Sequence, residues 1–102
     1  MEIDLEKRLK EICKYLVVKL KGNQGENGNA IIDRDLIKLL HISLDDYKDS
    51  IVNEGLVSKE LVGALFYTCS RFYIQSKYSN NSEDLLKEFD KLNTKLLKVF
   101  FI

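Results

Sequence analysis

Apolar residues recur along the chain at intervals of three and four, the spacing of a stripe on one face of an α-helix. The first stripe consists of Leu5, Leu9, Ile12, Leu16 and Leu20. Asp4 stands where an N-terminal cap would be, and Gly22 stands where the helix would end. The pattern therefore predicts a first helix between these two residues.

A polar segment over residues 22–29 interrupts the pattern. It holds three glycines and three asparagines and no apolar residue, which predicts a loop. Its glycine spacing invites comparison with a phosphate-binding loop. No strand precedes it and no Lys-Ser or Lys-Thr pair follows its last glycine, so a solvated connector is favoured.

The helical pattern resumes at Ala30 and falters at His41. A new start signal follows, in which a cap, a capping box and a flanking hydrophobic staple would be provided by Ile42, Ser43, Asp46 and Tyr47. We therefore predict that the second helix is broken near His41, and that a short helix follows and ends before Gly55.

Two further helices are predicted in the second half of the chain. Ser58 is placed to cap residues 59–77, whose apolar stripe consists of Leu61, Leu65, Cys69 and Phe72. After a turn over residues 78–81, Ser82 is placed to cap a last helix with a stripe at Leu85, Phe89, Leu92, Leu96 and Val99. Short loops join these units, and no segment alternates as a half-buried strand does. We predict a single domain over residues 1–102, an all-α antiparallel four-helix bundle.

Charge and composition narrow the classes of function. Lys plus Arg equals Asp plus Glu at 16 each, so no overall field attracts nucleic acid, and a nucleic-acid partner is not expected. The N-terminus opens with carboxylates rather than a basic signal sequence, and the longest nearly apolar run, residues 61–69, is too short for a membrane span. These features predict a cytoplasmic protein.

The chain has few of the residues that most often act in catalysis or bind metals, with two cysteines and one histidine. A disulfide between Cys13 and Cys69 and two separate buried thiols both fit the pattern, and cytosolic cysteine usage favours the thiols. His41 is the one histidine and has no metal-ligand spacing around it, so we predict a structural or capping role and no metal or cofactor. No catalytic residue is proposed, and the chain is not expected to be an enzyme.

Residues 33–55 have the outline of a helix-turn-helix. Their second helix would carry four carboxylates and a single lysine, which opposes docking on a phosphate-lined groove. Ser50 and Asn53 could still reach bases while cations elsewhere hold the backbone. A DNA-binding regulator therefore remains an alternative.

The last helix carries a row of lysines beside its apolar stripe. The row consists of Lys87, Lys91, Lys95 and Lys98, and the chain then continues as Val99-Phe100-Phe101-Ile102. One interpretation is a solvated face with an apolar plug at its end. The other is a surface that meets a protein at the membrane, or the membrane itself. On the second interpretation the candidate partner-binding residues are Lys77, Tyr78, Lys87, Lys91, Lys95, Lys98, Phe100 and Phe101.

The whole chain resembles the immunity proteins for pediocin-like bacteriocins, the enterocin A immunity family. The resemblance rests on Asn53-Glu54-Gly55, on Leu61-Val62 at the start of a long helix, on a turn at residues 79–82 and on an amphipathic last helix from Glu83. It differs in ending with Phe100-Phe101-Ile102 rather than an Arg-Tyr-Gly type of sequence, and in the predicted break near His41.

The resemblance implies a cytosolic four-helix bundle that protects a bacteriocin producer from a membrane-active peptide. Such a protein would engage the bacteriocin-bound sugar-transport receptor, and its C-terminal half would carry specificity. The lysine row separately favours a peripheral position at the inner face of the membrane. The competing classes are the DNA-binding regulator and a protein inhibitor of phage or mobile-element origin.

Overall fold

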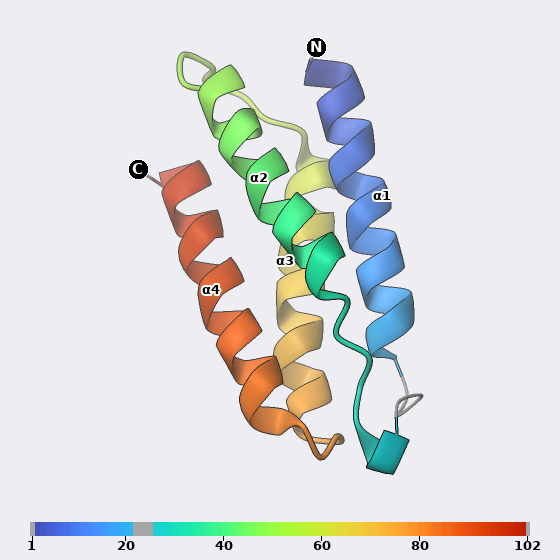
Figure 1. Ribbon diagram of the computed structural model, residues 1–102. Coiled ribbons are helices and arrows are strands. Elements are labelled where there is room, and N and C mark those ends of the chain that lie inside the picture. Colours follow the sequence, from blue (N-terminus) through green and yellow to red (C-terminus); the bar gives the residue numbers. More distant parts are fainter. Residues whose placement is uncertain (1, 22–25, 102) are drawn as a thin grey trace.

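A computed structural model describes residues 2–21 and 26–101, and in these residues the fold is helical throughout. The elements are α1 (Glu2–Leu20), a short 3-10 helix η1 (Glu26–Gly28), α2 (Arg34–Ser50), α3 (Lys59–Ser76) and α4 (Ser82–Phe101), shown in Figure 1. The predicted all-α four-helix bundle is confirmed. Gly22 and Ile102, to which the sequence assigned roles, lie outside the described residues.

Consecutive helices run in opposite directions, but they are not all neighbours (Figure 1). The helices that pack are α1 with α2, α1 with α3, α2 with α4 and α3 with α4. The pairs α1–α3 and α2–α4 are parallel, because residues 51–58 cross diagonally over one end of the bundle. Consecutive helices are therefore antiparallel as predicted, and the diagonal connection adds the two parallel neighbouring pairs.

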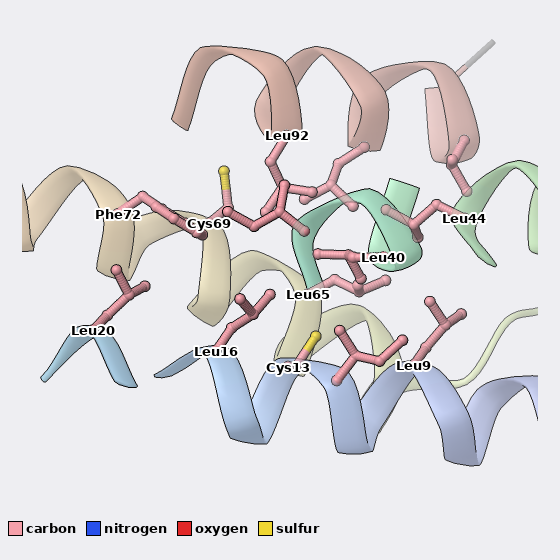
Figure 2. Close-up of a cluster of buried hydrophobic side chains, with 14 of the residues drawn as sticks. Leu9, Cys13, Leu16, Leu20, Leu40, Leu44, Leu65, Cys69, Phe72 and Leu92 are labelled. Atoms are coloured by element: carbon pink, nitrogen blue, oxygen red, sulfur yellow. The ribbon is translucent and has the colours of Figure 1, made fainter. Parts of the chain in front are cut away.

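One apolar core joins the four helices. Figure 2 shows side chains that meet at its centre, among them Leu9, Leu16, Leu40, Leu44, Leu65, Phe72 and Leu92. Each predicted stripe supplies part of it, and a fully buried leucine side chain contributes roughly 1.5–3 kcal/mol relative to an exposed one. The hydrophobic periodicity therefore located the core correctly.

The predicted break near His41 is absent. Helix α2 is continuous through Ser43, which is fully buried and faces the core instead of capping a new helix. Leu40, Ser43, Leu44 and Tyr47 hold positions i, i+3, i+4 and i+7 of one buried stripe, so packing continues across the local start signal. The actual cap is Asp33, whose carboxylate accepts a hydrogen bond from the Leu36 N–H at 3.0 Å.

The predicted caps of the other helices are confirmed in one case and wrong in two. The Ser58 hydroxyl accepts a hydrogen bond from the Leu61 N–H at 3.2 Å, so the predicted cap of α3 is confirmed. Helix α1 begins at Glu2, before Asp4, and α4 includes Ser82, so these two predicted caps are wrong. Helix α2 ends at Ser50, several residues before Gly55.

Asn80 and Asn81 fasten the α3–α4 turn to the loop before α2. The Asn81 side-chain amide donates to the Ala30 carbonyl at 3.0 Å and accepts from the Ala30 N–H at 2.9 Å. The Asn80 N–H bonds to the Gly28 carbonyl at 3.1 Å. Gly28 has a φ of 76°, a left-handed conformation that glycine adopts at little cost. The α1–α2 connection and the α3–α4 turn are thereby joined at the same end of the bundle.

Cys13 and Cys69 are free and buried, which confirms the thiol interpretation. Burial raises the pKa of both thiols, that of Cys69 to about 11 from 9.0. We expect native protein to react with Ellman's reagent at pH 8 far more slowly than denatured protein, since the raised pKa of Cys69 lowers the thiolate fraction of that residue roughly 100-fold and the pKa of Cys13 is raised as well. Labelling of the native protein as fast as of a guanidinium-denatured sample would contradict this.

Candidate functional site

The four lysines predicted on α4 do share a side of the helix, but they divide into two pairs. Lys95 bonds to Asp45 of α2 at 2.5 Å, and Lys91 lies 3.8 Å from Glu88. Lys87 and Lys98 are exposed, and neither makes a salt bridge to any described residue. Only this second pair is placed to offer its charges to a partner.

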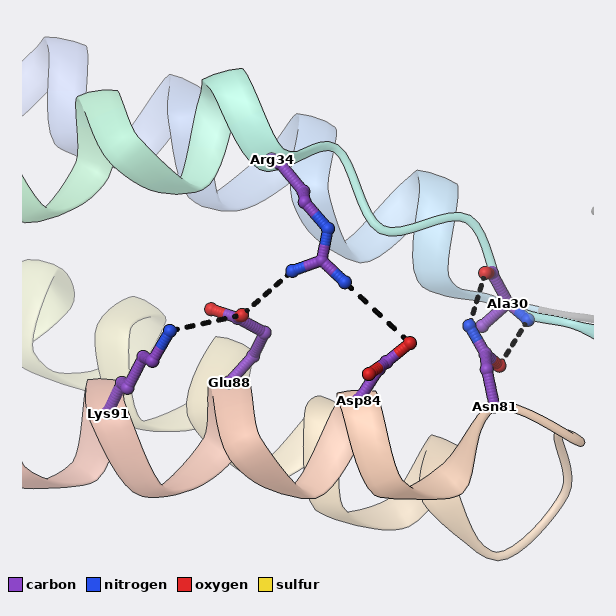
Figure 3. A network of polar contacts seen from close by, with 6 residues as sticks. All are labelled: Ala30, Arg34, Asn81, Asp84, Glu88 and Lys91. Atoms are coloured by element: carbon purple, nitrogen blue, oxygen red, sulfur yellow. Dashed lines mark hydrogen bonds and ion pairs between the residues drawn. The ribbon is translucent and has the colours of Figure 1, made fainter.

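Lys91 belongs to a network that ties α2 to α4 (Figure 3), and Lys95 joins the same two helices through its separate ion pair with Asp45. At the centre of the network is Glu88, which is 5% exposed and accepts a hydrogen bond from Arg34 of α2 at 3.1 Å. The Arg34 guanidinium also lies 3.7 Å from Asp84. A buried carboxylate needs such cations to offset its lost hydration, so this network is structural. Sequence reasoning missed Glu88, although a carboxylate on the core side between Leu85 and Leu92 was a signal.

His41 lies in the middle of α2, so its interpretation as a capping residue is wrong. It lines the groove between α2 and α4 together with Lys38 and Lys91. Burial and the nearby Lys95 ammonium lower the pKa of His41, which keeps the imidazole neutral at pH 7. In the described part of the chain, no group of three or more His, Cys, Asp or Glu side chains could hold a metal ion.

Phe100 and Phe101 have different environments despite their adjacency. Phe100 packs against the core, with its ring centroid 6.2 Å from that of Tyr47 and 6.5 Å from that of Phe66. Phe101 is 73% exposed. The two predicted interface residues therefore separate into one that packs internally and one that is available to a partner.

Phe101 lies beside apolar side chains of the diagonal α2–α3 connection. Phe101, Val52 and Val57 line one hollow of about 430 Å³, and the neighbouring Leu56 is 89% exposed. We call Val52, Leu56, Val57 and Phe101 the apolar end. Sequence reasoning missed its first three members. The signal was an apolar-rich loop, residues 51–57, that no helical stripe absorbed.

Lys77 and Tyr78 lie at the opposite end of the bundle, which is 46 Å long (Figure 1). Lys77 sits over the Tyr73 ring, with its Nζ 4.8 Å from the centroid, and Tyr78 is exposed. The structure thus places these two residues far from Phe101. The candidate residues therefore lie on two separate surfaces. The apolar end exposes more apolar side chains than the end with Lys77 and Tyr78, so it differs more from an ordinary solvated surface.

Comparison of the chain with protein-family models, with curated proteins and with solved structures finds no significant match. No described helix combines the length and the apolar character needed to cross a membrane.

Proposed function

We propose that this chain is a cytoplasmic, non-enzymatic binding protein that confers immunity to a pediocin-like bacteriocin. Its partner would be the membrane receptor or the bacteriocin–receptor complex. The observation that carries the proposal is the apolar end, where Leu56 is 89%, Val52 76% and Phe101 73% exposed. Exposed apolar side chains gathered at one place are typical of an interaction surface. The resemblance in length, helix order and C-terminal amphipathic helix supplies the class of partner.

Cations beside the apolar end suit a partner at the membrane. Lys98 precedes Phe101 by three residues, so the two side chains are neighbours on α4. Lys48 lines the same hollow as Phe101. Glu54 also lines this hollow, so the flanking charges are two lysines and one carboxylate, and their net positive charge favours contact with anionic headgroups, or with a protein seated among them. Peripheral membrane contact is therefore part of the proposal.

The helix-turn-helix that motivated the DNA-binding alternative is absent from residues 34–50. A helix-turn-helix needs a turn between two helices, and residues 34–50 form one uninterrupted helix. The solvent side of α2 also presents exposed carboxylates, including Asp46 and Asp49. The inhibitor of phage or mobile-element origin would be the alternative to adopt if protection cannot be detected.

We expect expression of the intact protein in a sensitive strain to restore growth under at least one pediocin-like peptide. The double variant Lys87→Gln/Lys98→Gln should protect less well, because it removes the two α4 cations that no described carboxylate pairs. Growth curves over a range of peptide concentrations measure both effects.

The matched control is Lys91→Gln/Lys95→Gln, which removes the same charge from the ion pairs with Glu88 and Asp45. It should lose stability in denaturant titrations by ~1 kcal/mol, since partly exposed ion pairs are weak, while keeping protection at temperatures where it is folded. Absence of protection by the intact protein across a broad panel of peptides would overturn the proposed function.

A further inference from the structure

A second surface, remote from α4, lies between the parallel helices α1 and α3. A groove of about 300 Å³ runs there, and its apolar walls include Val17, Val18, Ala64 and Tyr67. Val18 is 55% and Tyr67 51% exposed, and they face each other's helix across the groove that both line. The groove is therefore an apolar surface that the fold itself leaves uncovered.

All the charged side chains that line this groove are lysines, namely Lys10, Lys14 and Lys21. Lys10 is engaged by Glu60 of α3, with an Nζ–Oε1 distance of 2.8 Å. Lys14 and Lys21 are exposed and make no salt bridge within the described part of the chain. An apolar groove with a cationic rim complements a partner that is apolar at its centre and acidic at its edges.

The dimensions of the groove fit an α-helix. Its lining along α1 extends from Lys10 to Lys21, which at 1.5 Å per residue is roughly 16 Å, or about three helical turns. The α3 wall of the groove includes Ala64, whose side chain is a single methyl group. A small residue at this position allows a third helix to approach the two closely, as helices do when one packs into a groove.

We infer that the α1–α3 groove is a docking site for an acidic amphipathic helix of a partner protein. The apolar stripe of that helix packs between Val18 and Tyr67, and its flanking carboxylates pair with Lys14 and Lys21. The site is independent of the proposed function, since it shares no residue with the apolar end.

The probe is a blocked 16-residue synthetic peptide with leucine at positions i, i+3, i+4 and i+7 of each repeat, glutamate on both flanks and alanine elsewhere. Titrated into ¹⁵N-labelled full-length protein, it should shift the amide resonances of residues 14–21 and 64–68 with salt-sensitive affinity. A peptide with lysine in place of glutamate should bind more weakly, because its charges repel the rim.

Charge reversal by Lys14→Glu/Lys21→Glu should weaken binding of the acidic peptide about tenfold and strengthen binding of the basic one, since it removes two weak exposed ion pairs and replaces each with repulsion. Leu56→Glu, at the apolar end, should change neither affinity, which separates this site from the proposed function. The inference is overturned if the acidic peptide shifts no α1 or α3 resonance, or if the charge-reversed protein binds both peptides as the intact protein does.

Discussion

Replacing Ile42 with proline should lower the free energy of unfolding by about 3 kcal/mol or more. Helix α2 passes through residue 42 without a break, so proline would remove a main-chain hydrogen bond and clash with the preceding turn. The Ile42 side chain is half exposed, so its loss contributes little. Since domains of this kind are stable by roughly 5–15 kcal/mol in total, the variant should be severely destabilised.

Denaturant unfolding followed by circular dichroism measures this loss. Ile42→Ala is the matched control and should change stability by only ~0.5 kcal/mol, because it removes an exposed side chain and keeps the backbone donor. A second helix capped by Ser43 would instead accept proline at residue 42, outside its first turn. A loss no larger than that of the alanine control would therefore show that α2 is broken as the sequence alone suggested.

The helices themselves could be predicted because each is specified by neighbours in the sequence. Leu61, Leu65, Cys69 and Phe72 recur at helical spacing, and all four are buried in α3. The Ser58 cap was likewise readable, since its partner is the N–H of Leu61, three residues away. Such contacts join residues that are close in the sequence, so they form whatever the spatial order of the helices in the bundle.

The break near His41 was predicted wrongly because a local signal competed with a tertiary one. Ser43 has the chemistry of a cap, but its small side chain also fits against the core between Leu40 and Leu44. Burial of the flanking apolar residues on one continuous face stabilises the uninterrupted helix by more than a cap would, since a cap contributes about 1 kcal/mol.

The candidate site could be predicted only in part, because its environment depends on helix order in space. The lysine row could be predicted from the spacing of its residues along the sequence. The ion pair between Lys95 and Asp45 could not, because it forms only when α2 and α4 pack as parallel neighbours. The apolar end combines Val52 and Val57 with Phe101 because the α2–α3 connection crosses the bundle diagonally. Nothing in the local pattern specifies that crossing.

The adjacent residues Phe100 and Phe101 should give opposite results when each is replaced with alanine. Phe100→Ala should cost about 2–4 kcal/mol, since it removes a ring packed against Tyr47 and Phe66 at the edge of the core. Phe101→Ala should change stability by only ~0.5 kcal/mol, because the side chain is 73% exposed. Denaturant titrations of both variants measure this difference.

Protection against a pediocin-like peptide should depend on Phe101 rather than on Phe100, the opposite of the effect on stability. At a temperature where both variants are folded, Phe101→Ala should lose most of its protection and Phe100→Ala should retain it. An exposed aromatic ring at the centre of an interface commonly carries 2 kcal/mol or more of binding energy, which corresponds to a roughly 30-fold loss of affinity. Leu56→Ala, on the same apolar end, should resemble Phe101→Ala. If both exposed-residue variants fold and protect as well as the intact protein, the apolar end is not the partner surface.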